Sequence, residues 1–270
     1  PGETWYRVTY LEVDENGWLA PDKLRQAITD DTILVSIMTA NNEVGTIMPI
    51  KELAAIAHER ETLFHTDAIQ AIGKVRVDVE DLGVDMLTIS GHKFHAPKGI
   101  GALYVRKGVE LESLVHGGRQ ESGLRAGTEN VPSIVGLGKA AELALHTLRD
   151  SEKIKVLRDK LEAGIKKLIP GARLNGHREN RLPNTLNLTL PGLRGESLVL
   201  ALDQYGISFS SGSACKSGSP EPTHVLMAMG RTEEEAHCAV RFSLSLGTTE
   251  EDIDETISAL AQVLEEMETV

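Results

Sequence analysis

Lys93 lies in a short turn between two apolar stretches, an unusual place for an isolated amine. The residues "DMLTIS" before the turn and "GALYV" after it each predict a strand, and "GHKFHAPKGI" joins them. A lysine at a strand end is usually solvated or salt-bridged. The alternative is chemistry, because a lysine made reactive by burial and nearby cations forms a Schiff base with a carbonyl cofactor. Ser90 and His92, on either side of Gly91, could donate to an anion such as a phosphate.

A carboxylate and an amide follow another predicted strand, in "FHTDAIQAIGK". Strand-end carboxylates in covered sheets point into the ligand crevice. Pyridoxal phosphate needs a lysine for its aldehyde and an acid beside its ring nitrogen. Asp67 could be that acid, because a carboxylate paired with the ring nitrogen keeps the nitrogen protonated. Gln70 could reach the ring hydroxyl from the same side. A helix cap for "AIQAIG" explains Asp67 equally well.

Two adjacent amides, Asn41 and Asn42, come directly after the apolar stretch "TILVSIM". Paired amides there can orient a bound carboxylate or ring oxygen, and turn chemistry explains them equally well. The lysine, the carboxylate and the amides thus follow three successive predicted strands. This convergence indicates a ligand site more strongly than any one of the three.

The two cysteines have different surroundings. Cys215 lies in "SSGSACKSGS", whose polarity argues against the core position that is usual for a lone cysteine. A mobile loop and the adjacent Lys216 suit a reactive thiolate. Cys238 leads into a predicted strand, and we expect it in the core.

The elements that must position these residues predict an α/β fold. Predicted helices cover 21–29 and 50–60, and predicted strands cover 32–38, 62–67, 85–90 and 101–106. Their apolar runs are continuous rather than alternating, which indicates a mostly parallel sheet covered on both faces. We assign residues 1–142 to this large domain.

Residues 143–270 predict a smaller α+β domain that carries the cysteine loop. Predicted helices cover 151–171, 195–206 and 248–267, and predicted strands cover 184–190 and 239–245. The strand at 184–190 alternates apolar and polar residues, so we expect it to be half exposed. Thr248 and Glu251 form a possible capping box for the last helix.

Composition narrows the classes of function. The net charge of the 270 residues is -12, which argues against a general binder of nucleic acid or of anionic membranes. Two cysteines make no disulfide framework and fit a reducing cytoplasm, and no apolar run reaches membrane-spanning length. His65, His92, His95 and Asp67 lack the spacing of a metal motif, so we expect no metal site.

Four motifs occur in order between residues 39 and 131: "TANNEVGTIMPI", "HTDAIQAIGK", "SGHKFHAPKGIGALYVRKG" and "GGRQESGLRAGTENV". They resemble the motifs of cysteine desulfurases, which are pyridoxal-phosphate enzymes of class V with the aspartate-aminotransferase fold (fold type I). The resemblance implies that Lys93 bonds covalently to the cofactor, that Asp67 pairs with the ring nitrogen and that Gln70 contacts the ring hydroxyl. It implies a phosphate site at Ser90 and His92, with His92 also among the catalytic residues.

The resemblance extends to substrate and partners. Asn42 would lie near ring and substrate, and Thr128, in "AGTEN", would reach the cofactor of the other subunit in a homodimer. The start and length of the Cys215 loop resemble the nitrogen-fixation and iron-sulfur-assembly class, class I. Cys215 would then take sulfur from L-cysteine as a persulfide, leave L-alanine, and pass the sulfur to a scaffold or other acceptor. Arg241 would hold the substrate carboxylate through a bidentate fork, with a surface ion pair as the alternative.

The chain departs from this family at its start. The family's phosphate-binding turn with a Gly-Thr pair, and its ring-stacking histidine, would both come before the first residue. We therefore expect that an amino-terminal portion is absent and that the chain alone binds the cofactor poorly. Two alternatives stay open: another enzyme of the same fold, such as an aminotransferase or a selenocysteine lyase, and a non-catalytic module that has lost its cofactor.

Overall fold

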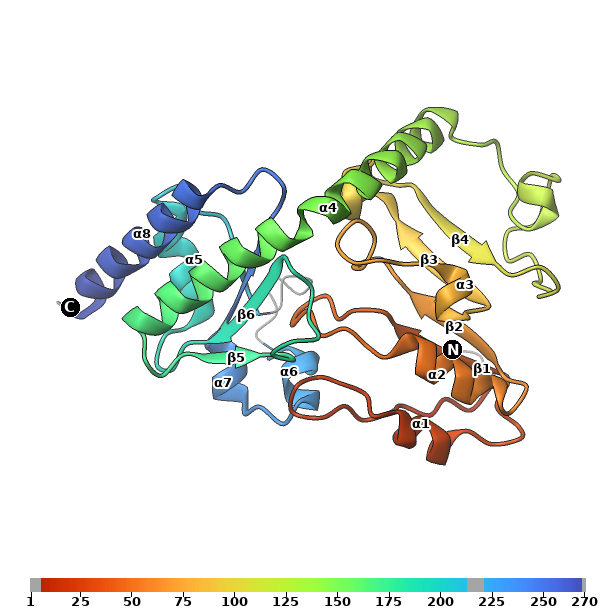
Figure 1. Ribbon diagram of the computed structural model, residues 1–270, viewed down its shortest axis with the longest axis horizontal. Coiled ribbons are helices and arrows are strands. Elements are labelled where there is room, and N and C mark those ends of the chain that lie inside the picture. Colours follow the sequence, from red (N-terminus) through yellow and green to blue (C-terminus); the bar gives the residue numbers. More distant parts are fainter. Residues whose placement is uncertain (1–5, 213–220, 269–270) are drawn as a thin grey trace. The chain divides into compact units, whose positions relative to one another are not determined.

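The computed structural model describes residues 6–212 and 221–268 (Figure 1). The chain packs as two compact units, which we name after one residue of each. The Lys93 unit comprises Asp30–Thr39 and Ile50–Arg149, and the Arg241 unit comprises Pro1–Thr29, Ala40–Pro49 and Asp150–Val270. The predicted domain boundary between residues 142 and 143 stays a prediction.

The Lys93 unit is built on a four-stranded sheet (Figure 1). Its strands, in spatial order, are β1 (Leu34–Met38), β2 (Leu63–Asp67), β3 (Met86–Ser90) and β4 (Gly101–Val105). The first three are parallel and β4 runs antiparallel to β3, so the sheet is mostly parallel, as predicted. Parallel neighbours need crossovers, which α2 (Ile50–His58) and α3 (Val79–Leu82) provide. The carboxyl ends of β1, β2 and β3 therefore share one edge.

The Arg241 unit contains an antiparallel sheet. Its strands, in spatial order, are β5 (Arg173–Asn175), β6 (Thr185–Thr189), β8 (Ala239–Ser243) and β7 (Ser210–Ser211). Its helices are α1 (Pro21–Ala27), α5 (Gly195–Asp203), α6 (His224–Ala228), α7 (Glu233–His237), α8 (Glu250–Glu268) and the second half of α4 (Val131–Leu168). A core of apolar side chains from α4, α5, α8, β6 and β8 holds the unit together, Leu161, Ile165, Leu188 and Leu260 among them.

The prediction that residues 184–190 form a half-exposed strand is wrong, because every residue of β6 is buried. Its polar side chains bond to other buried groups instead of to water. The amide of Asn175 donates to Asn187 at 2.9 Å and to Thr189 at 2.8 Å, and Asn187 donates to the carbonyl of Glu43 at 3.2 Å. A buried polar row produces the same alternation in the sequence as a solvated face.

The capping box of α8 lies one residue further along than predicted. The N–H of Thr249 donates to the carboxylate of Asp252 at 2.7 Å, and the N–H of Asp252 donates to the Thr249 hydroxyl at 3.1 Å. Thr248 instead accepts from the N–H of Ser245 at 3.0 Å. Both threonines are followed three residues on by an acid, so spacing alone could not choose between them. No described helix combines the length and the apolar character that crossing a membrane requires.

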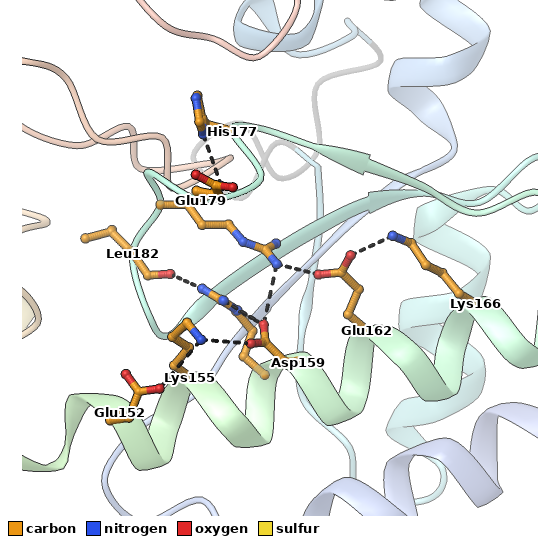
Figure 2. Close-up of polar contacts among 10 residues, drawn as sticks. Glu152, Lys155, Asp159, Glu162, Lys166, His177, Glu179 and Leu182 are labelled. Atoms are coloured by element: carbon orange, nitrogen blue, oxygen red, sulfur yellow. Dashed lines mark hydrogen bonds and ion pairs between the residues drawn. The ribbon is translucent and has the colours of Figure 1, made fainter.

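Two buried arginines are compensated by acids of the second half of α4 (Figure 2). The side chains of Arg158 and Arg181 are 3% and 5% exposed. Arg158 donates to Asp159 at 2.6 Å and to the carbonyl of Leu182 at 2.7 Å, and Arg181 pairs with Glu162. Burial raises the pKa of Glu162, but the cationic partners outweigh burial and hold that pKa below its usual value. Ionised Glu162 therefore stabilises the fold.

Replacing Glu162 with glutamine should destabilise the protein by about 3–5 kcal/mol, because Arg181 becomes a buried charge without adequate compensation. A lowered carboxyl pKa gives stability that is present above the unfolded-state pKa and is lost as pH falls through the folded-state pKa. The difference from wild type, measured by urea unfolding, should therefore shrink in acid. The exposed pair Lys153–Asp150 offers the control, since Lys153→Ala should leave the free energy of unfolding close to that of wild type. Equal losses in the two variants would contradict this account of the network.

Candidate active site

The carboxyl edge of the Lys93 unit's sheet brings together the ends of β2 and β3. Asp67 is the last residue of β2 and is in register with Thr88 of β3, two residues before Ser90. The N–H of Thr39 donates to the carbonyl of Asp67 at 2.8 Å, so the ladder with the segment after β1 continues to this edge. The predicted ring-nitrogen acid and one predicted phosphate ligand thus end adjacent parallel strands.

Asp67 uses one carboxylate oxygen for the local turn and leaves the other unpaired. Its Oδ1 accepts from the N–H of Ile69 at 2.8 Å, and its Oδ2 makes no hydrogen bond to any described residue. The residues that follow form hydrogen-bonded turns rather than the helix that the cap alternative required. Gln70 lies in these turns, where its side-chain oxygen Oε1 accepts a hydrogen bond from Nζ of Lys74 at 3.1 Å. Its amide nitrogen makes no hydrogen bond within the described chain.

A single turn of 3-10 helix, η1 (Gly91–Phe94), follows β3 and sets the direction of Lys93. A Cβ at Gly91 would lie 2.9 Å from the Cβ of Ala96 and 3.0 Å from Ile100, so only glycine fits there. Gly91 and Phe94 are buried, which leaves the two residues between them facing outward. The absence of a side chain at Gly91 therefore lets the backbone of this turn pack closely against the protein's own core.

His92 and Lys93 are both exposed. The hydroxyl of Ser90 and Nδ1 of His92 lie 2.9 Å apart in a hydrogen bond, so the two predicted phosphate ligands contact each other. Lys93 makes no hydrogen bond or ion pair with a described residue. The expectation that burial makes Lys93 reactive does not fit this exposed amine, because η1 turns it away from the core.

A cross-strand hydrogen-bonded chain stiffens the sheet near this edge. His65 of β2 lies 2.8 Å from the hydroxyl of Ser36 on β1 through Nδ1 and 2.8 Å from that of Thr88 on β3 through Nε2. Burial lowers the pKa of His65, although the charge of Asp67 opposes this. The imidazole is thus used in packing the strands. Within 6–212 and 221–268, no group of three or more His, Cys, Asp or Glu side chains could hold a metal ion.

In the Arg241 unit, the two predicted substrate-binding residues are in direct contact. Arg241 on β8 donates from Nη1 to the main-chain carbonyl of Asn42 at 2.9 Å and from Nη2 to the hydroxyl of Ser210 at 3.4 Å. It is half-buried and has no ion pair with a described residue. Its Nε is buried without a hydrogen-bond partner. These contacts fix the guanidinium without neutralising its charge. The alternative, a surface ion pair of Arg241, is not seen among the described residues.

The paired amides have separate roles. Oδ1 of Asn41 accepts from the N–H groups of Glu43 at 2.8 Å and Val44 at 3.0 Å, so Asn41 forms the turn. The side-chain amide of Asn42 makes no hydrogen bond within residues 6–212 and 221–268 and stays available to a ligand. Turn chemistry thus explains the first of the two amides and not the second.

The remaining predicted residues are placed as follows. Thr128 is exposed, in a loop of the Lys93 unit before α4. Cys238 is 5% exposed and lies in the core, as predicted. Cys215 and Lys216 lie outside the described residues.

The sequence reasoning missed one buried acid, Glu43, which directly follows the paired amides. Its carboxylate accepts a hydrogen bond from the hydroxyl of Thr223. Burial raises the pKa of Glu43 more than this bond and the charges of His224 and Arg241 lower it. The available signal was a charged residue inside the otherwise uncharged stretch "TANNEVGTIMPI".

Comparison with known proteins agrees with this geometry. Residues 3–256 match the family model described as aminotransferase class-V. The cysteine desulfurase IscS of Dictyoglomus turgidum is 50% identical over 266 residues, which are 98% of this chain and 68% of that protein. A solved NifS-like protein superposes with a TM-score of 0.89 at 42% identity, over 97% of this chain and 69% of that one.

A third relative was solved with an amino acid. The structure described as SspA in complex with cysteine has a TM-score of 0.72 and 38% identity, over 89% of this chain and 67% of that one. The chain thus spans about two thirds of the length of the proteins it matches. It belongs to the class-V aminotransferase family, among the cysteine desulfurases of that family.

Proposed function

We propose that the protein is a pyridoxal-phosphate-dependent cysteine desulfurase that converts L-cysteine to L-alanine and receives the sulfur as a persulfide on Cys215. The observation that carries the proposal is the shared sheet edge of the Lys93 unit. There, Asp67 and Ser90 end adjacent parallel strands, and the unpaired amine of Lys93 follows directly. The relative solved with cysteine supports this amino acid as the substrate.

The residues of the Lys93 unit fit the cofactor. A free carboxylate oxygen of Asp67 suits a protonated ring nitrogen, and the free amide nitrogen of Gln70 suits the ring hydroxyl. The linked Ser90 and His92 can donate to phosphate, and Lys93 would hold the aldehyde carbon covalently. When bound, pyridoxal phosphate supplies an electron sink for charge on the substrate α-carbon.

Side chains of the protein bind the substrate and carry out the remaining steps of the reaction. Arg241, with the amide of Asn42 beside it, holds the α-carboxylate of the amino acid. The amine of Lys93, once free, takes the α-proton as a general base. The thiolate of Cys215 attacks the substrate sulfur, so an S–S bond forms and the Cβ–S bond breaks. The electron pair of the broken bond stays with Cβ, which takes up a proton, and the amine of Lys93 returns its proton to Cα, which gives alanine.

We also propose that two copies associate, that the persulfide sulfur passes to an iron-sulfur scaffold or another acceptor protein, and that the enzyme works in the cytoplasm. Exposed apolar side chains of the Lys93 unit support a second copy, among them Leu114, Val135 and Leu145, which are 92%, 66% and 67% exposed. Thr128 is exposed and would reach the partner's cofactor. The unpaired, buried Cys238 is compatible with a reducing compartment.

Asp67→Asn tests the cofactor assignment. The amide keeps an oxygen for the N–H of Ile69, so the turn should persist, but it cannot hold the ring nitrogen protonated. Alanine formation should fall roughly 100-fold or more, measured as kcat on the cofactor-loaded protein. Asp78→Asn is the control, since Oδ1 of Asp78 likewise accepts from the N–H two residues on, and Asp78 is not among the proposed site residues. Full activity of Asp67→Asn would contradict the assignment.

A further inference from the structure

Glu43 is a carboxylate buried in the Arg241 unit, one residue after the Asn42 carbonyl that holds Arg241. Glu43 is 5% exposed and Thr223, its hydrogen-bond partner, is 3% exposed. The Thr223 hydroxyl also accepts from the N–H of Val225 at 3.2 Å, so its single proton is free to be donated to Glu43. Glu43 thus ties the turn after Asn42 to the start of α6.

The charges of two side chains lower the pKa of this carboxylate: His224 on α6 and Arg241 on β8. Arg241 gives its hydrogen bonds to a carbonyl and a hydroxyl, and within the described chain it has no ion pair. Glu43 therefore acts on Arg241 through its electric field rather than through contact. At the low effective dielectric of a partly buried site, such a field remains strong over several ångströms.

We propose that Glu43 is a positioning residue that limits how tightly Arg241 holds a carboxylate. Its charge offsets part of the guanidinium charge, and its bond to Thr223 fixes the turn whose Asn42 carbonyl orients that guanidinium. This inference rests on the proposed function, because it takes Arg241 as the group that binds the amino acid. L-Cysteine and L-alanine carry the same α-carboxylate, so an unmoderated arginine would retain the product as firmly as the substrate.

This arrangement couples the binding of an amino acid at Arg241 to the protonation of Glu43. A second carboxylate beside Arg241 makes ionised Glu43 less favourable, because like charges disfavour each other. Burial already raises the pKa of Glu43 against the opposing effects of Thr223, His224 and Arg241. Binding of an amino acid should therefore be accompanied by proton uptake, and its affinity should rise as pH falls.

The test is calorimetric titration of the cofactor-loaded protein with L-alanine, a product that does not donate sulfur. Glu43→Gln keeps an oxygen for Thr223 but removes the charge, so it should bind alanine roughly tenfold more tightly. It should also lose the part of the proton uptake that two buffers of different ionisation enthalpy reveal in wild type. Arg241→Gln is the companion variant and should bind alanine at least about a hundredfold more weakly.

The outcomes separate the two claims. If Arg241→Gln weakens alanine binding while Glu43→Gln leaves both affinity and proton uptake unchanged, the role of Glu43 is wrong and that of Arg241 stands. If Arg241→Gln binds alanine as wild type does, the proposed substrate site is wrong. The comparison of pH profiles is also decisive, because a ratio of wild-type to Glu43→Gln alanine affinity that does not change between about pH 5 and pH 8 would overturn the coupling.

Discussion

In a cofactor-loaded protein that includes the upstream portion, replacing Cys215 with serine should leave a yellow protein that still binds L-cysteine but no longer turns it into alanine. The hydroxyl of serine is a poor nucleophile toward sulfur, and in the proposed mechanism the thiolate forms the new S–S bond. We expect kcat for alanine formation to fall at least about a thousandfold, with the visible absorbance of the bound cofactor retained.

The matched control for this variant is Cys238→Ser. Cys238 is 5% exposed in the core of the Arg241 unit, so its hydroxyl analogue should cost stability, about 1–3 kcal/mol, and spare turnover. Sulfide release at the wild-type rate by Cys215→Ser would contradict the persulfide mechanism. An enzyme of the same fold that eliminates sulfide directly would then be the better interpretation.

Lys93→Ala should have an effect of similar size. The variant loses both the covalent attachment of the cofactor and the base for the α-proton, so alanine formation should again fall at least about a thousandfold. In wild type, borohydride reduction should fix the cofactor on the peptide that contains Lys93.

Lys98 offers a control within the same turn region. It is exposed like Lys93 and lies five residues further on, so simple exposure of an amine does not distinguish the two. Lys98→Ala should keep the covalent label and the activity. A label on Lys98 in wild type, or unchanged turnover in Lys93→Ala, would contradict the assignment of the cofactor lysine.

Local patterns predicted the strands of the Lys93 unit and α2 well, but not α3 or the first half of α4. The predicted strands at 32–38, 62–67 and 85–90 correspond to β1, β2 and β3, each with its polar candidate at or just after the carboxyl end. This worked because continuous apolar runs and the residues that end them are properties of neighbouring positions. The direction of the Lys93 side chain was harder to predict from the sequence, since it depends on how Gly91 and Phe94 pack against the core.

Long-range contacts account for most of what the sequence did not predict. The hydrogen bond between Thr223 and Glu43 joins residues 180 positions apart, and that between Arg241 and Asn42 joins residues 199 apart. The alternation of β6 was assigned to solvent because the buried groups that satisfy Asn187, the amide of Asn175 and the main-chain carbonyl of Glu43, lie 12 and 144 positions away in the sequence. A polar residue in a periodic pattern shows only that it needs a partner, and the fold decides whether that partner is water.

The most direct test of the account is a single turnover of the cofactor-loaded protein with less L-cysteine than enzyme. Mass spectrometry of the protein and analysis of the small-molecule products can be made on the same sample. The account predicts one alanine for each cysteine consumed and one additional sulfur atom on the peptide that contains Cys215. Formation of pyruvate and free sulfide, with an unmodified Cys215 peptide, would contradict it.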